Sequence, residues 1–389
     1  MASLRVDQIK AQAEADVGMA DSEPGAYDRN LSAIVNSVNE EARLSPTGEQ
    51  LTFDELVRAT RNRLEAGRWL RDHPEVLNET IDRPIFLTGL PRSGTTYMSY
   101  LFDCDPGLRQ LRHWEVYTPN PPPAHDPASV PARIAAVDAF DAARSAAVPN
   151  YAAMHLSDAD GPDECHWLLT QSYAQAGFFN NMRVPTYFDF LVDEIDLTPT
   201  FEVHKRQLQL LQWKAPRRRW SLKYPNHLLG MNAILEVYPD ARFVMTHRDP
   251  VQTLASLSKL TLMLRRRRSH DVDPHEVGRQ LRHFVRRHID RIMEFDATPA
   301  GRERVTHIDY YRLVDAPDVV LGEAYPKAGI EMTPVARENI AEWRRQNPKG
   351  RRGTHSYAME EFGLDPDEVA EEYRFYTRHF DIPREAEAA

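Results

Sequence analysis

Short apolar runs alternate with amphipathic stretches along the central part of the chain. Residues 84–90 form the first run, and helically spaced apolar residues follow it at 98–102. Similar runs occupy 220–224, 242–248 and 304–308, and the first two of these also lead into helical patterns. Strands that alternate with helices in this way predict an α/β fold, with a parallel sheet flanked by helices.

The chain before the first run reads as helical. Apolar residues recur there at helical spacing, and Thr52 and Glu55 are spaced as a capping box. We therefore predict a helical lead-in over residues 1–80 and an α/β domain over 81–389, with a helical insertion at about 132–215. The lead-in is interpreted as a structural cover, with a lid or an oligomer contact as the alternative. The oligomeric state does not follow from the sequence.

Composition narrows the function classes. The 389 residues carry a net charge of −10, which argues against a general nucleic-acid binder. Two cysteines are too few for a disulfide framework, and neither a signal peptide nor an apolar run near the ~20 residues of a spanning helix is apparent. These features predict a cytoplasmic protein, with peripheral membrane contact left open.

The turn after the first run has the spacing of a phosphate-cradling loop. Four residues separate Gly89 from Gly94, and the loop opens a helix, so backbone amides converge on an anion site. A nucleotide triphosphatase places Lys after the second glycine, whereas this chain has Thr95. Arg92 supplies the cation instead, with hydroxyls from Ser93, Thr95 and Thr96. This P-loop-like turn therefore suits an oxyanion held without a metal ion.

Two of the other apolar runs also end at a basic residue. Lys223 and Arg248 lie at the ends of the predicted strands, and Ser256 follows Arg248 by eight residues. Ligands of open parallel sheets bind beyond the carboxyl ends of the strands. We therefore expect these side chains and the 89–96 loop to meet around one anionic ligand.

The segment from Gly89 to Thr96 resembles the 5′-phosphosulfate loop of sulfotransferases that use 3′-phosphoadenosine 5′-phosphosulfate (PAPS), nearer to the bacterial and tyrosylprotein branch than to the cytosolic one. The resemblance implies that PAPS is the co-substrate and 3′,5′-ADP (PAP) the product, without a metal. It assigns the 5′-phosphosulfate to the residues between Arg92 and Thr96, the bridging oxygen to Lys223 and the 3′-phosphate to Arg248 and Ser256. The residues it implies for donor binding are Arg92, Ser93, Gly94, Thr95, Thr96, Tyr97, Arg248, Ser256, Lys349, Gly350 and Arg351.

Two of these implied roles have alternatives. Tyr97 stacks on adenine or packs within its helix. The segment from Lys349 to Gly353 resembles the one that closes over the 3′-phosphate, but Pro348 stands where the family has Arg. The alternatives to a sulfotransferase are a P-loop nucleotide kinase or NTPase and a non-catalytic nucleotide-binding protein.

The catalytic base needs a separate assignment, since Pro225 stands where cytosolic sulfotransferases have His. Glu115 is our choice, because it lies about where the tyrosylprotein branch places its catalytic Glu and Trp114 would raise its pKa by desolvation. The alternatives are His113, Glu164 and His227.

The acceptor is expected to be an alcohol on a lipophilic molecule. Aromatic residues are dense over 167–190, which indicates core packing or an apolar acceptor pocket. The basic run from Arg265 to Arg268 ends a predicted helix, where the helix dipole favours cations. Docking to an anionic lipid or acceptor is the other reading of that run.

Overall fold

The computed structural model describes residues 3–23, 25, 27–147, 158–348 and 359–384 of the chain. Its centre is a parallel sheet with strand order β2-β3-β1-β4-β5, which confirms the predicted fold class. The strands are β1 (Ile85–Gly89), β2 (Leu108–Arg109), β3 (Arg219–Lys223), β4 (Arg242–His247) and β5 (Val305–Asp309).

Strand β1 lies in the middle of the sheet, and all its residues are buried. Phe86 pairs with Leu222 of β3 on one side and with Phe243 of β4 on the other. Apolar side chains on both faces suit a strand that is covered by helices on both sides. Because the strands are parallel, β1, β3 and β4 all end at the same edge of the sheet.

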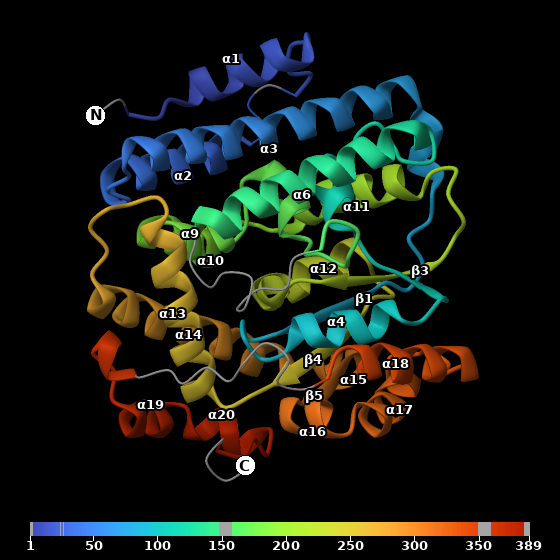
Figure 1. Ribbon diagram of the computed structural model, residues 1–389, viewed down its shortest axis with the longest axis vertical. Coiled ribbons are helices and arrows are strands. Elements are labelled where there is room, and N and C mark those ends of the chain that lie inside the picture. The colour runs from blue at the N-terminus through green and yellow to red at the C-terminus, as the bar shows by residue number, and fades with distance from the viewer. Residues whose placement is uncertain (1–2, 24, 26, 148–157, 349–358, 385–389) are drawn as a thin grey trace.

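Helices surround this sheet (Figure 1). Before it lie α1 (Val6–Val17), α2 (Asp28–Glu41), α3 (Pro46–Asp72) and η1 (Pro74–Asn78). Between β1 and β3 lie α4 (Thr95–Asp103), α5 (His113–Tyr117), η2 (Pro127–Ser129), α6 (Val130–Ala147), α8 (His166–Leu169), η3 (Thr170–Ser172), α9 (Gly177–Asn181), α10 (Pro185–Asp193) and α11 (Thr198–Gln212). Then come η4 (Pro225–Gly230), α12 (Met231–Val237), α13 (Pro250–Arg266), α14 (Pro274–Asp296) and α15 (Pro299–Arg304). After β5 lie α16 (Tyr310–Asp315), α17 (Pro317–Lys327), α18 (Pro334–Gln346), η5 (Met359–Phe362), α19 (Pro366–Glu372) and α20 (Arg374–His379).

The N-terminal helices pack on the main domain. Leu31 and Ile34 belong to the same buried cluster as Phe243 of the sheet. The predicted capping box is wrong, because α3 begins earlier than expected. Ser45 caps α3 by accepting a hydrogen bond from the Gly48 amide, and Thr52 lies inside the helix. The Ser45-Pro46 pair is itself a strong helix start, since proline is favoured in the first helical turn.

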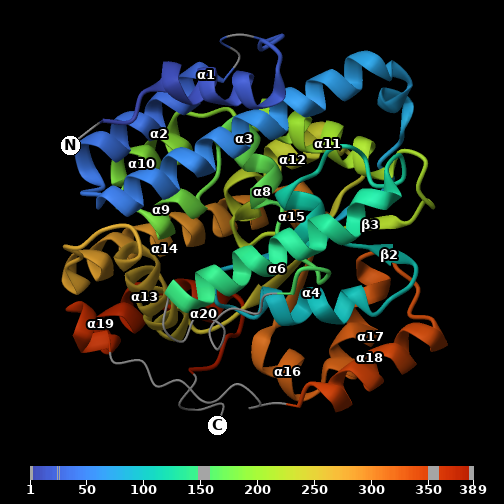
Figure 2. The same cartoon turned by 45° about the horizontal axis from the view of Figure 1, so that its top comes forward.

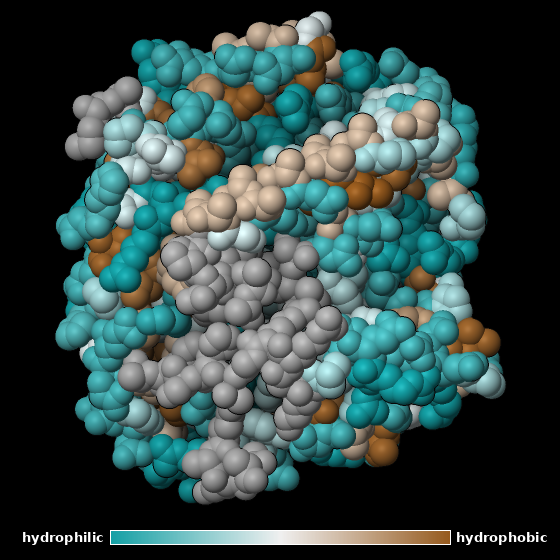
Figure 3. All heavy atoms as spheres, viewed as in Figure 1, coloured by the Kyte–Doolittle hydropathy of each residue, from teal (hydrophilic) through white to brown (hydrophobic). Residues whose placement is uncertain are grey.

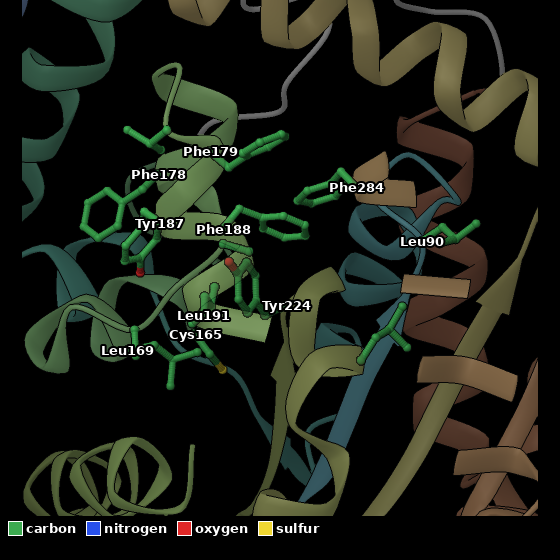
Figure 4. Packing of buried hydrophobic residues seen from close by; sticks show 14 of the residues in the cluster. Leu90, Cys165, Leu169, Phe178, Phe179, Tyr187, Phe188, Leu191, Tyr224 and Phe284 are labelled. Carbon is green, nitrogen blue, oxygen red and sulfur yellow. The ribbon is translucent and has the colours of Figure 1, made fainter. Parts of the chain in front are cut away.

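Most aromatic residues between 167 and 190 belong to the core. The ring centroids of Phe179 and Phe188 lie 4.9 Å apart, and Phe188 lies 4.8 Å from Phe284 of α14 (Figure 4). Tyr187 is also buried, and its hydroxyl donates to the Tyr173 carbonyl. The density of rings therefore reflects packing between α9, α10 and α14.

The basic run at the end of α13 is largely internal. Arg265 is buried and donates to the Phe179 carbonyl and to Gln280. Arg268 is also buried and binds Glu55 of α3. These two arginines hold helices together and do not form an exposed cationic patch.

Helix α6 crosses the molecule between α3 and α4 (Figures 1 and 2). Its outer face carries exposed alanines such as Ala135, Ala136 and Ala139, and Figure 3 shows a weakly hydrophobic band over it. Its inner face points toward α5, against which it packs. Within the described residues, no helix is long and apolar enough to span a bilayer.

Candidate active site

The loop after β1 places a helix N-terminus at the carboxyl edge of the sheet. Gly94 caps α4 with φ 89°, and Gly89 has φ 146°. A Cβ on Gly94 would lie 2.6 Å from the Tyr310 ring, so only glycine fits there. Arg92 itself has φ 74°, a conformation that costs free energy outside glycine and concentrates at functional sites. The loop thus places the amides at the start of α4 at the edge of the sheet where the sequence predicts that an anion binds.

Ser93 has a different role from the one that the resemblance implies. Its side chain is fully buried, and its hydroxyl donates to the Leu90 carbonyl at 2.6 Å. The same oxygen lies 2.8 Å from the Thr246 hydroxyl of β4. The Ser93 hydroxyl thus closes the loop against the sheet. Thr95 and Thr96 line the open side of the loop instead.

Arg92, Arg248 and Ser256 form one cluster. The Arg92 Nε donates to the Ser256 hydroxyl at 3.0 Å, and an Arg248 Nη donates to the Arg92 carbonyl at 3.1 Å. The Arg248 guanidinium also lies over the Tyr310 ring, 4.5 Å from its centroid. Two guanidinium groups beside a helix N-terminus concentrate positive charge at one place, so this cluster suits a multiply charged anion.

Lys223 and Glu164 form a second pair at the same edge. The Lys223 ammonium donates to Glu164 Oε1 at 2.7 Å, and His166 Nδ1 lies 3.3 Å from the other carboxylate oxygen. Burial raises the pKa of Glu164, but Lys223 and His166 outweigh it and hold that pKa well below its usual range. A backbone bridge between Glu164 and Lys223 fixes the two residues side by side.

Glu115, the expected base, lies outside the cleft described below. Its Oε1 accepts from Arg109 at 2.8 Å, and its Oε2 accepts from the Arg112 amide at 3.1 Å. It is buried and caps the start of α5. We correct the assignment on this ground, because both carboxylate oxygens already bind within the fold and Glu115 does not line the cleft.

Two of the alternative bases are also enclosed. His227 is fully buried, with its ring 5.0 Å from that of Phe86, and burial holds its pKa well below the usual value. His113 lies 3.3 Å from both Asp141 and Asp163. Burial lowers the pKa of His113, but the two carboxylates outweigh that effect and raise the pKa above its usual value. Glu164 is the alternative that the structure brings to the cleft.

Tyr97 packs within the fold. Its ring lies 5.8 Å from that of Trp343 of α18, and it does not line the cleft. Helix packing is therefore the reading that its contacts support. The remaining predicted donor residues, Lys349, Gly350 and Arg351, lie outside the described residues.

Some of these groups, among them Arg92, Arg248 and Glu164, line one cleft of about 600 Å³. The loop after β1, Arg248 and Tyr310 line one part of it. Residues of α3, α5, α6, α8 and α9 line the other part, and Glu164 contributes its carboxyl. Aromatic rings of Tyr117, Phe140 and Trp167 gather in the second part, with centroids 4.9 to 6.2 Å apart. An anion site thus continues into an aromatic chamber.

Most residues of the aromatic chamber could not be predicted from the sequence. Tyr117, Phe140 and Arg58 come from three helices that are distant in the chain, and none of them belongs to a motif. Only Trp167 lay in the aromatic-rich stretch that suggested an acceptor pocket.

Within the described residues, no group of three His, Cys, Asp or Glu side chains is arranged to hold a metal ion.

Comparison with known proteins identifies the family. Residues 84–334 match the model of the sulfotransferase family. The structure is similar to that of sulfotransferase STF9 from Mycobacterium avium, with 31% identity, 97% of each chain covered and a TM-score of 0.87. Sulfotransferase STF1 from Mycobacterium tuberculosis H37Rv is similar at 28% identity, with 95% of this chain and 98% of that chain covered and a TM-score of 0.83. No match was found among curated proteins. The chain belongs to the sulfotransferase family.

Proposed function

We propose that the protein takes its sulfuryl group from PAPS and transfers it to a hydroxyl of a largely apolar acceptor. One observation carries this proposal: the loop after β1, with two arginines at its side, opens into the same cleft as Glu164 and the aromatic chamber. An anionic donor and an apolar acceptor would therefore meet at the Lys223–Glu164 pair.

The residues present fit the donor. The amides at the start of α4, with Arg92, Thr95 and Thr96, would hold its 5′-phosphosulfate, and Arg248 with Ser256 would hold its 3′-phosphate. The tight approach of Tyr310 to Gly94 leaves backbone amides as the contact surface there. When bound, PAPS supplies an activated sulfuryl group and a stable leaving phosphate.

Lys223 and Glu164 supply the remaining chemistry. We assign Glu164 as the base that takes the proton of the acceptor hydroxyl, because its carboxylate lines the cleft. Lys223 holds Glu164 ionised while the donor site is empty. As Lys223 turns toward the donor's negative charge, Glu164 loses the larger of its two counter-charges and keeps only His166, and burial then raises its pKa toward the range of a working base. Donor binding would thus prepare the base.

A nucleotide screen tests the donor. We expect 3′,5′-ADP to stabilise the protein without magnesium and to do so more than 5′-AMP, because Arg248 and Ser256 are assigned to the 3′-phosphate. At about 100 times Kd the gain in unfolding free energy is about 2.7 kcal/mol. Thermal-shift and calorimetric titrations with both nucleotides, ATP and GTP measure it.

Two results would contradict the donor assignment. Equal stabilisation by 3′,5′-ADP and 5′-AMP removes the 3′-phosphate site, and magnesium-dependent stabilisation by ATP or GTP favours a kinase or NTPase. Turnover of labelled PAPS with a panel of lipophilic alcohols then separates an enzyme from a non-catalytic nucleotide-binding protein.

A further inference from the structure

Arg58 of α3 reaches into the aromatic chamber. Its guanidinium carbon lies 4.5 Å from the ring centroid of Tyr117, 5.0 Å from that of Trp167 and 6.0 Å from that of Phe140. The side chain is half-buried and lines the cleft. A cation therefore stands among three rings on the acceptor side of the site.

The carboxylates nearest to Arg58 along α3 have other partners. Glu55, one turn earlier, binds Arg268 at 2.6 Å, although Arg58 helps to lower its pKa. Asp54 accepts from Gln50 at 2.8 Å. Among the residues that the structure describes, Arg58 contacts rings but makes neither a hydrogen bond nor an ion pair. A guanidinium has five N–H donors, so Arg58 can donate charge-assisted hydrogen bonds to an anion that binds in the cleft.

The other arginine near the chamber differs in this respect. Arg144 of α6 lies 5.1 Å from the Phe140 ring, but it also binds Asp141 at 2.6 Å. Its charge is therefore balanced by its own helix. Within the described residues Arg58 forms no ion pair of its own: Glu55 attracts it but is bound to Arg268, so an anionic ligand would supply a direct counter-ion.

Trp167 connects Arg58 with the reacting groups. His166 lies beside Glu164, the ring of Trp167 lies 4.8 Å from that of His166, and the Arg58 guanidinium lies 5.0 Å from the same Trp167 ring. A molecule that binds both Glu164 and Arg58 would therefore lie along the ring of Trp167.

We propose that Arg58 determines acceptor specificity by binding an oxyanion, a carboxylate or a phosphate, at the end of the acceptor that is remote from the reacting hydroxyl. The acceptor is then an amphipathic anion, with an apolar body on the rings of Trp167 and Tyr117, and not a neutral lipophilic alcohol. This inference rests on the proposed function, because it takes Glu164 as the place of the hydroxyl.

Ligands that differ only in the charge of one end test the role of Arg58 by binding alone, without turnover. Binding of a long-chain ω-hydroxy fatty acid, its methyl ester and an ω-hydroxyalkyl phosphate is measured by calorimetry and by quenching of tryptophan fluorescence, with and without 3′,5′-ADP. We expect the two anions to bind roughly 10- to 100-fold more tightly than the ester, the range of a charge-assisted hydrogen bond. The stronger of the two anions identifies the preferred oxyanion.

Substitutions locate the effect. Arg58→Met keeps an apolar side chain against the rings. It should weaken the binding of both anions, leave the affinity for the ester unchanged, and so remove the preference for the anions. Arg58→Lys should restore part of the preference. Arg61→Met is the matched control, since Arg61 lies on the same helix but does not line the cleft, and it should leave every affinity unchanged.

The outcomes separate this inference from the donor assignment. Equal affinity for acid and ester, absence of binding by all three ligands, or a preference that survives in Arg58→Met would overturn the role of Arg58. Failure of 3′,5′-ADP to bind, with the anion preference intact, would overturn the donor assignment instead. Loss of stability in Arg58→Met without any change in preference would reduce Arg58 to a clamp for the rings.

Discussion

At the scale of single residues, two glutamates illustrate what a buried ion pair does and does not say about function. Glu115 and Glu164 each accept a hydrogen bond from a buried cation, Arg109 in one case and Lys223 in the other. Both oxygens of Glu115 are held inside the fold, whereas Glu164 borders the cleft. Accessibility to a ligand, and not burial or charge, therefore separates a base from a structural acid.

The two glutamine variants test this distinction. Glu164→Gln should lower turnover roughly 10²–10⁴-fold, the usual contribution of a general base, and leave 3′,5′-ADP binding intact. Glu115→Gln should instead lower the unfolding free energy, because it leaves Arg109 buried without its counter-charge, and keep the turnover of the folded fraction. Steady-state kinetics and urea unfolding of both variants measure this. Normal turnover in Glu164→Gln would show that Glu164 is not the base.

At the scale of elements, the start of α4 depends on one contact with α16. Tyr310 begins α16, and its ring occupies the space that a Cβ on Gly94 would need, while the φ of Gly94 is itself left-handed. We expect Gly94→Ala to cost about 1–3 kcal/mol of stability through strain and to weaken 3′,5′-ADP binding at least tenfold by moving the amides of α4. Gly107→Ala is the control, because Gly107 lies in the turn after α4, outside the cleft. Calorimetric titration compares them, and equal binding by the two variants would show that the loop amides do not hold the donor.

The sequence predicted those elements that have a short-range pattern of residues. The buried run of β1, the glycines of its loop and the strands that end at Lys223 and His247 all have short-range signatures, and the structure has them. The two-residue strand β2 has none. The Glu164–Lys223 pair joins residues on separate elements, and no spacing rule connects them. The choice of Glu115 was wrong for the same reason, since its hydrogen bond with Arg109 and its burial depend on the folded chain.

At the scale of the whole molecule, α3 of the N-terminal region is part of the candidate active site. Helix α3 lines the cleft with Leu51, Glu55 and Arg58, and Leu56 on the same helix belongs to the core cluster that contains Phe243 of β4. The sequence predicts a lead-in that covers the main domain. The contacts of α3 give it a second role, because it forms one wall of the aromatic chamber.

The pair of Glu55 and Arg268 joins that wall to the helix that follows β4. Its side chains are 14% and 9% exposed, and Arg268 also donates to the Thr52 hydroxyl at 2.9 Å. Breaking one partner of a buried pair costs about 3–5 kcal/mol, because the other charge is left uncompensated, whereas replacing both costs much less. We therefore expect Glu55→Gln and Arg268→Met each to lower the unfolding free energy by about that amount, and the double variant by less than the sum. Urea unfolding of the four proteins measures the coupling. Additive losses would mean that the two side chains stabilise α3 and α13 separately, and that the chamber wall is held in place by apolar packing alone.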